Sequence, residues 1–115
     1  MAPGNPPPLT PAGYQVLLAL AGGKAHGYAV MRFIEDATGG SVQLGPGTLY
    51  RTIARLVADG LVEETDTGEA DTRRRNYRLT PLGRTAAERE SALLARLVDL
   101  ATEAGLLPDL GRHTA

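Results

Sequence analysis

The chain has 115 residues, enough for a single domain with a modest hydrophobic core. It contains no cysteine, which excludes disulfide frameworks, thiolate nucleophiles and cysteine-based metal sites. No apolar run reaches the roughly 18 residues of a membrane span, and the N-terminus lacks the basic start and apolar stretch of a signal peptide, so we expect a cytoplasmic protein. The formal net charge is −1, so binding to nucleic acid would require the basic residues to gather on one face.

A first helix is predicted to begin at residue 11. Residues 1–9 are rich in proline and lack helical periodicity, which is typical of a flexible tail. Thr10 can cap the helix, Pro11 suits its first position, and Leu9 can pack against a residue one turn inside. The glycine pair 22–23 ends the helix. Its predicted buried stripe consists of Tyr14, Leu17, Leu18 and Ala21.

Two more helices are predicted from the same kinds of signal. The second covers residues 27–38 and is ended by the glycine pair 39–40. Its predicted buried stripe consists of Val30, Phe33, Ile34 and Ala37. Residues 41–44 form a brief extended link, and the third helix runs over residues 46–59 until Gly60 stops it.

The sequence pattern then changes to a period of two, which predicts a β-hairpin. Its strands are residues 61–65 and 74–79, and the polar residues 66–72 form the connecting loop. Tyr77 and Leu79 are expected to face the core. The opposite side of the second strand is expected to carry Arg74, Asn76 and Arg78.

A long last helix is predicted from Pro81 to about Ala104, with Thr80 as its cap and Gly105 as its stop. The chain is therefore mostly α with a small β-hairpin, and the order of its elements is that of a winged helix-turn-helix followed by a long C-terminal helix. The expected divisions are a winged helix domain over 10–80, a dimerisation helix over 81–107 and a second tail over 108–115.

The third helix carries the main functional signal. At 100° per residue, one side holds Leu49, Ile53, Leu56 and Val57. The other side holds Thr48, Arg51, Thr52, Arg55 and Asp59. Arginine reads guanine edges in a major groove and threonine reaches phosphates or thymine methyl groups, so this polar side suits a DNA recognition helix.

Two alternatives stay open on this helix. Its polar side is also that of an ordinary solvated helix, on which Arg55 pairs with Asp59 one turn along. Tyr50 lies on the flank of the apolar side. Packing at the edge of the core is the favoured role of its ring, and a phosphate contact by its hydroxyl is the alternative.

The hairpin carries the densest basic cluster of the chain, which consists of Arg73, Arg74, Arg75 and Arg78. A two-stranded ribbon beside a recognition helix can place arginines on flanking phosphates or in the minor groove. The alternative is a solvated cluster that is paired with nearby acids. Those acids are Glu63, Glu64, Asp66, Glu69 and Asp71.

Several of these segments together resemble the PadR family of transcriptional regulators. They are His26-Gly27-Tyr28-Ala29-Val30, Gly47-Thr48-Leu49-Tyr50, Leu56 to Leu61 with Asp59-Gly60, and Arg74 to Gly83. The resemblance covers about residues 10–85, with the elements in the right order and spacing. It implies a bacterial winged helix regulator of the compact subgroup with one helix after the wing, and for most members a repressor, often released by a small molecule.

The resemblance also implies roles for individual residues. It places Gly47, Thr48, Tyr50 and Arg51 at the start of the recognition helix, and Arg73, Arg74 and Arg75 on the wing. With Thr52 and Arg55 from the polar side of the same helix, these are the predicted DNA-binding residues.

Two departures from the family qualify what the resemblance implies. The wing tip is acidic, at Asp66, Glu69 and Asp71, where many relatives carry glycine and basic residues. We therefore expect the tip to lift off the phosphates and leave contact to the arginines on the strands. Some compact relatives stack flat drugs on a tryptophan of the last helix, and this chain contains no tryptophan.

The last helix carries an apolar stripe that is longer than its own domain can cover. The stripe consists of Leu93, Leu97, Leu100, Ala104 and Leu107, and is widened by Leu94, Val98 and Ala101. A second copy would cover the remainder and supply the two-fold symmetry of a palindromic operator, with two recognition helices about 34 Å apart. The alternative is a helix that covers only its own domain. A small-molecule effector would sit near the dimer interface.

The predicted function is that of a sequence-specific regulator of transcription that binds double-stranded DNA as a homodimer. The alternative is a winged helix that binds other proteins without DNA, which the net charge and the acidic tip favour. We do not expect an enzyme, because the two histidines, His26 and His113, lie in a loop and a tail and no glycine-rich phosphate motif is present. His26 is expected to pack or cap near the second helix. No metal, cofactor or membrane partner is expected.

Overall fold

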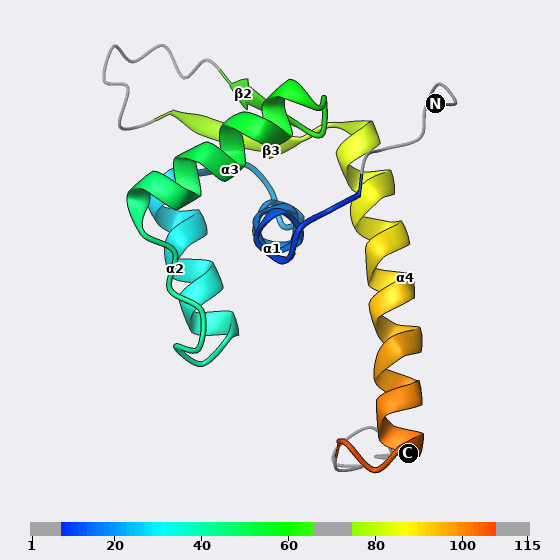
Figure 1. Cartoon of the computed structure of the whole chain (residues 1–115). Coiled ribbons are helices and arrows are strands. Elements are labelled where there is room, and N and C mark those ends of the chain that lie inside the picture. Colours follow the sequence, from blue (N-terminus) through cyan, green and yellow to red (C-terminus); the bar gives the residue numbers. More distant parts are fainter. Residues whose placement is uncertain (1–7, 66–74, 108–115) are drawn as a thin grey trace.

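The computed structural model describes residues 8–65 and 75–107. These residues form four helices and a small three-stranded sheet (Figure 1). The elements are α1 (Pro11–Leu20), β1 (Ala25–His26), α2 (Gly27–Ala37), α3 (Pro46–Ala58), β2 (Val62–Thr65), β3 (Asn76–Leu79) and α4 (Pro81–Glu103). The predicted fold class and the order of helices and hairpin are confirmed. The predicted tails at 1–9 and 108–115 lie outside the described residues except for Pro8 and Leu9, and Leu9 is partly buried against the core.

Three of the four helices begin with a side-chain cap. The Thr10 hydroxyl accepts a hydrogen bond from the Gly13 amide at 2.9 Å, and the Thr80 hydroxyl accepts one from the Gly83 amide at 3.0 Å. His26 caps α2 through Nδ1, which accepts from the Ala29 amide at 3.2 Å. The role expected for His26 beside the second helix is therefore confirmed.

The end of α3 fixes where the hairpin begins. Gly60 has a φ of 78°, and the Leu61 amide donates to the Leu56 carbonyl at 2.9 Å, which closes the last turn of the helix. The Leu61 amide is thus used by the helix end, and β2 begins at Val62 rather than at the predicted residue 61. In the second strand, β3 begins at Asn76, so Arg75 precedes it.

The sheet contains one strand that the sequence did not predict. Its order is β1-β3-β2 and both pairs are antiparallel. The two-residue strand β1 pairs Ala25 with Tyr77 and His26 with Asn76, while Val62 pairs with Leu79 in the hairpin. A strand of two residues has no alternation to detect, and its partner lies about 50 residues away in the sequence.

The core is aliphatic and is built around α1, which lies between α2, α3 and α4 in Figure 1. The prediction for α1 was partly wrong. Leu17 is buried as expected, but Leu18 is 42% exposed and Ala21 is also exposed. Val16 and Leu20 are buried instead. Residues 16–21 are all apolar, so the sequence had no polar side to set the phase of the helix.

Smaller corrections apply to the next two helices. In α2, Val30 and Ile34 are buried as predicted, whereas Phe33 is 40% exposed and Ala37 is exposed. In α3, Val57 was predicted on the buried side but is 40% exposed. The remaining predicted core residues of α3 and the wing are buried or partly buried; they are Leu49, Ile53, Leu56, Tyr77 and Leu79.

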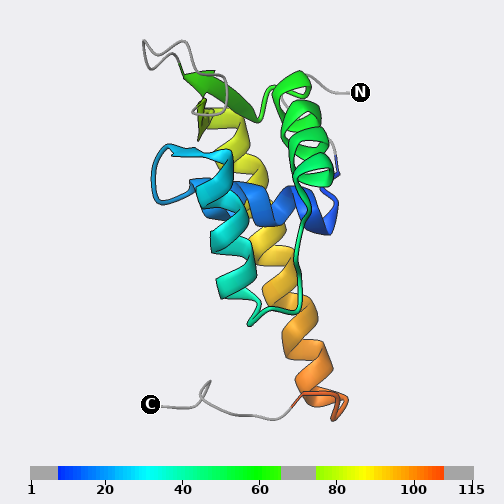
Figure 2. The ribbon, with the colours of Figure 1, turned by 90° about the vertical axis from the view of Figure 1, so that its left-hand side faces the viewer.

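The long helix α4 leaves the body of the domain. Its first turns pack on the core through Ala86, which is 3% exposed, and its later turns run past the end of α2 in both views (Figures 1 and 2). The sheet and α3 lie at the opposite end of the molecule from the C-terminal end of α4 (Figure 2). No helix in residues 8–65 and 75–107 is long and apolar enough to cross a membrane.

Candidate nucleic-acid interface

The helix α3 presents a basic outer surface. Its buried residues Leu49, Ile53 and Leu56 hold it on the core, so the residues on the opposite side of the helix point to solvent. The exposed outer residues include Gly47, Thr48, Arg51 and Arg55, all of them predicted DNA-binding residues. The structure therefore brings these four together on one accessible face.

Arg51 is positioned near the start of α3. Its guanidinium donates a hydrogen bond from Nη2 to the Thr48 hydroxyl at 3.3 Å, and both side chains are exposed. No carboxylate partner of Arg51 is found in the part of the chain that the structure describes. Thr52 is different: it is only half exposed, and its hydroxyl donates to the Thr48 carbonyl within the helix at 2.8 Å. Arg51 is thus the more available group for an external acceptor.

Arg55 is paired with an acid. Its Nε lies 3.4 Å from the Asp59 carboxylate one turn along, and the Arg55 side chain is 79% exposed. An exposed pair of this kind contributes roughly 0.3–0.5 kcal/mol, whereas a bidentate arginine–guanine contact is worth about 1–3 kcal/mol. The pairing alternative for Arg55 is therefore realised in this structure, but the pair is weak enough to be replaced by a stronger acceptor.

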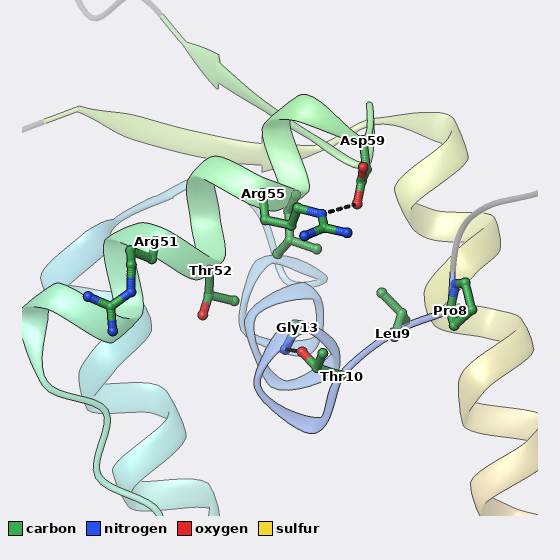
Figure 3. A pocket seen from close by; sticks show the side chains of 9 residues that line it. Pro8, Leu9, Thr10, Gly13, Arg51, Thr52, Arg55 and Asp59 are labelled. Carbon is green, nitrogen blue, oxygen red and sulfur yellow. Dashed lines mark hydrogen bonds and ion pairs between the residues drawn. The ribbon is translucent and has the colours of Figure 1, made fainter.

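A shallow groove runs between α3 and the start of α1. It has a volume of about 260 Å³, and the Arg55–Asp59 pair lies on its α3 side while the Arg51 guanidinium points away from that pair (Figure 3). The lining residues include Leu9, Thr10 and Thr52. Ligand pockets in proteins usually occupy about 300–1,000 Å³ and are mostly apolar, so this groove is not a good candidate for a small-molecule site.

Tyr50 lies on the flank of α3 that faces the wing. Its ring and hydroxyl pack so closely over Gly27 that a Cβ atom at that position would collide with them. Tyr50 is nevertheless 42% exposed, and it borders a second groove of about 340 Å³ between α3 and the strands. The ring thus packs at the edge of the domain, against the start of α2.

The described wing arginines are paired with acids across the hairpin. Arg78 lies opposite Glu63 in the ladder, with 2.6 Å between Nε and the carboxylate. Arg75 lies 3.3 Å from the Glu64 carboxylate through Nη1. All four side chains are at least 43% exposed, so these pairs are solvated. The predicted sites Arg73 and Arg74, and the acidic tip at Asp66, Glu69 and Asp71, lie outside the described residues.

The predicted dimer stripe on α4 is exposed in the single chain. Leu93 is 48%, Leu97 49% and Leu100 51% exposed, and Leu107 is 40% exposed. Ala104 is also exposed, and the flanking Leu94, Val98 and Ala101 are half-buried. The large apolar side chains of Leu18 and Phe33, which the sequence assigned to the core, add to the exposed apolar surface of the helices.

Among the described residues, Tyr77 is a buried titratable group. Burial raises the pKa of Tyr77 above its ordinary value of 10.0, with further contributions from Glu64 and Tyr50. Within the described ranges, no group of three or more His, Cys, Asp or Glu side chains is placed to hold a metal ion.

The sequence and the fold were compared with known proteins. Residues 16–89 match the family model described as "Transcriptional regulator PadR-like family". A 37.1 kDa uncharacterised protein of transposon Tn4556 from Streptomyces fradiae is 48% identical over 82 residues, which are 71% of this chain and 22% of that protein. The transcriptional regulator Rv3488 of Mycobacterium tuberculosis is 42% identical over 55 residues, which are 48% of this chain and 51% of that protein. The chain thus spans about a fifth and about half of the lengths of these two relatives.

Solved structures show the same fold. RosR of H. salinarum superposes with a TM-score of 0.64 at 27% identity, over 86% of this chain and 96% of that one. PadR of Bacillus subtilis, solved in complex with operator DNA, has a TM-score of 0.59 at 19% identity, over 67% of this chain and 44% of that one. The second likeness shows the fold alone.

The family match settles the class of protein. It covers α2, α3, the hairpin and the beginning of α4, which are the elements on which the candidate interface is built. Members of this family are transcriptional regulators and not enzymes, so the expectation that the chain is not an enzyme is confirmed. The chain belongs to the PadR-like family of transcriptional regulators.

Proposed function

We propose that this protein regulates transcription by binding a specific palindromic operator in double-stranded DNA as a homodimer. The observation that carries the proposal is the outer face of α3, on which Arg51 is exposed and, among the described residues, bonded to the neutral Thr48 hydroxyl rather than to a carboxylate. In a winged helix this face enters the major groove, where an arginine fork matches the N7 and O6 acceptors of guanine.

The other predicted contact residues take graded roles in this proposal. Gly47 and Thr48 bring the start of α3 close to the DNA, and Arg55 exchanges its Asp59 partner for a base or phosphate. Thr52 and Tyr50 act mainly by packing, since the Thr52 hydroxyl is bonded within the helix and the Tyr50 ring lies on Gly27. Arg73, Arg74 and Arg75 supply flanking phosphate contacts from the wing.

The homodimer is supported by the exposed stripe on α4. Leu93, Leu97 and Leu100 are each about half exposed on a helix that extends beyond its own domain. Full burial of a leucine side chain contributes about 1.5–3 kcal/mol, so covering these residues on two copies would contribute several kcal/mol. In this proposal residues 10–80 bind DNA and residues 81–107 form the dimer, with Ala104 and Leu107 at the far end of the contact.

Repression and release by a small molecule are the regulatory part of the proposal. A dimer bound across an operator blocks access to a promoter, and an effector that binds near the α4 interface would change the relative placement of the two recognition helices. The proposal places this protein in the cytoplasm, where the DNA and the effector are both available.

The first test is binding to the genomic DNA upstream of the chain's own coding sequence, measured by mobility shift over a salt series with random duplex as competitor. We expect binding that survives the competitor and weakens as salt rises, because phosphate contacts release counterions. Arg51→Ala should weaken this binding, and Arg32→Ala serves as control because Arg32 is an exposed arginine on α2, outside α3, the wing and the helix of the proposed dimer. Absence of binding to this DNA and to random duplex at every salt concentration would contradict the proposal.

Two observations favour a second candidate function, a winged helix that binds protein and not DNA. Arg55, Arg75 and Arg78 are all paired with carboxylates, which lowers the positive potential of the DNA-facing side. The apolar side chains of Tyr50 and Val57 are exposed beside them. The same mobility shift separates the two functions, because a protein-binding module would show no salt-dependent association with any duplex.

A further inference from the structure

The starts of α1 and α4 share one local motif. Thr10-Pro11-Ala12-Gly13 and Thr80-Pro81-Leu82-Gly83 both place threonine at the cap, proline at the first helical position and glycine three residues after the threonine. In both motifs the threonine hydroxyl accepts a hydrogen bond from the glycine amide, at 2.9 Å in α1 and 3.0 Å in α4. As helix caps, the two motifs are equivalent.

The second motif also makes contacts that the first does not. The Thr80 hydroxyl donates to the Gly60 carbonyl at 2.6 Å, and the Thr80 amide donates to the Leu61 carbonyl at 3.1 Å. Gly83 lies directly against the same Leu61 carbonyl, where a Cβ atom would collide with the backbone oxygen. Gly60 and Leu61 are the two residues that complete the C-terminal turn of α3. The start of α4 therefore contacts the end of α3 directly, through two hydrogen bonds and close packing of the two backbones.

We name the contact among Gly60, Leu61, Thr80 and Gly83 the α3–α4 joint. Leu61 and Gly83 are buried, and Thr80 is half-buried. Two other hydrogen bonds from α4 lead to α1 and are exposed: Arg84 to the Ala21 carbonyl at 3.4 Å, and Tyr14 with Ser91 at 2.7 Å. The joint is thus the direct hydrogen-bonded connection between the recognition helix and the long helix.

The length of α4 makes the angle at this joint important. From Gly83 to Leu97 the helix rises about 21 Å, at 1.5 Å per residue. A tilt of about 5° at the joint would move Leu97 by about 2 Å, and two protomers together by about 4 Å. Successive base pairs are about 3.4 Å apart, so this change corresponds to about one base pair between the two half-sites.

We propose that Thr80 is a positioning residue that fixes the angle between α3 and α4, and through it the spacing of operator half-sites that the dimer accepts. The inference rests on the proposed function, a homodimer on a palindromic operator. Thr80 touches neither DNA nor the partner copy in this proposal. It acts through its hydrogen bond to the Gly60 carbonyl, which holds the end of α3 at a fixed angle to α4, the helix of the proposed dimer.

Four substitutions separate the joint from the cap. Thr80→Val removes both the cap and the bond to Gly60. Thr80→Asp keeps a good helix cap but has no hydroxyl to donate to the Gly60 carbonyl. Thr10→Val is the matched control, because it removes the equivalent cap from α1 where no bond to the end of α3 exists. Thr80→Ser keeps both bonds and should restore the wild-type behaviour.

The experiment first selects an operator from a randomised duplex library with the wild-type chain. The selected duplex is then made with its centre lengthened or shortened by one and two base pairs, and as a single half-site. Dissociation constants of each variant are measured on this series by fluorescence anisotropy, and the fold is checked by circular dichroism. We expect the wild type and Thr10→Val to prefer one spacing by about tenfold over a change of one base pair.

For Thr80→Asp and Thr80→Val we expect the preference to fall to about threefold or less, or the optimum to move by one base pair, with half-site affinity retained within about threefold. An unchanged spacing optimum in Thr80→Asp, with the preference for it still about tenfold, would overturn the inference. Equal losses on the half-site and the palindrome would also overturn it, because they would show that Thr80 only holds the domain together. If the wild type selects no duplex, the proposed function itself fails, which is a different result from either.

Discussion

Arg51 and Arg55 share the outer face of α3 but differ in the partners that they have in the absence of DNA. Arg51 is bonded to the neutral Thr48 hydroxyl, whereas Arg55 is already bonded to the Asp59 carboxylate. A guanine or phosphate acceptor adds to the interactions of Arg51 and replaces an interaction of Arg55. Arg51 is therefore the residue on which sequence recognition should depend more strongly.

Arg51→Ala should weaken binding to the operator by about 1–3 kcal/mol, roughly 5- to 150-fold, if Arg51 reads a base. The measurement is the dissociation constant on the operator and on random duplex at one salt concentration. Arg51→Lys is the companion variant, because it keeps the charge and loses the bidentate fork. Equal losses on both duplexes in Arg51→Ala, with Arg51→Lys unaffected, would show that Arg51 contacts only phosphate.

Tyr77 should make the stability of the folded chain sensitive to alkaline pH. Burial raises the pKa of its phenol, and Glu64 and Tyr50 raise it further. Below the ordinary pKa of about 10 the phenol is neutral in both the folded and the unfolded chain, and the free energy of unfolding does not depend on its titration. Above that pH the unfolded chain loses the proton first, so the free energy of unfolding falls as the pH rises through the folded pKa.

Tyr77→Phe should remove this part of the alkaline instability while keeping the ring in the core. The check is urea unfolding of both chains at pH 7, 9, 10 and 11. The difference in unfolding free energy between the variant and the wild type should shift in favour of the variant above about pH 10. A difference that is constant over the whole series would contradict the assignment to Tyr77.

The partners of individual side chains could be predicted from the sequence only in part. The sequence offered Asp59 as a partner for Arg55 because the two are one turn apart on a helix, and that local rule held. The pairing of Arg75 with Glu64 depends on the register of the hairpin, and the packing of Tyr50 on Gly27 depends on how α3 meets α2. Both of the latter are set by tertiary contacts, which a single sequence does not specify.

Among the elements, the ends of the helices were easier to predict than their buried faces. The cap bonds of Thr10 and Thr80 and the helix end at Gly60 involve neighbours within a few residues, so caps and stops could be predicted from the local sequence. The buried face of α1 could not, because its apolar residues surround the helix and its position between three other helices decides which of them are covered. The strand β1 exists only because β3 lies beside it.

Gly60→Ala tests the end of α3. Gly60 has a φ of 78°, where an L-residue costs about 1–2 kcal/mol, so the variant should unfold at correspondingly lower urea concentration. Gly22→Ala is the matched control, since Gly22 has no positive φ and no atom within 4 Å of an added Cβ. If both variants lose the same stability, the backbone conformation of Gly60 is not the cause.

At the scale of the whole molecule, the exposed half of α4 should determine the oligomeric state. Leu97→Glu places a charge at the centre of the apolar stripe and should convert the proposed dimer into monomers, because a buried charge without a partner is costly. Molar mass by light scattering gives the result directly. Ala95→Glu is the control, since Ala95 is exposed on the other side of the same helix. An unchanged mass in Leu97→Glu would remove the stripe from the interface.

The carboxylates beside the arginines also affect how binding responds to ionic strength. A free arginine that contacts a phosphate releases a condensed counterion and contributes a slope of about −0.9 to the plot of log K against log salt. Arg75 and Arg78 must first leave Glu64 and Glu63, and each freed carboxylate then attracts a cation from solution. Fewer ions are released than the number of arginines suggests. Glu63→Gln with Glu64→Gln should therefore steepen the slope, and the wild-type complex should tolerate changes in cellular salt that would dissociate a regulator with unpaired arginines.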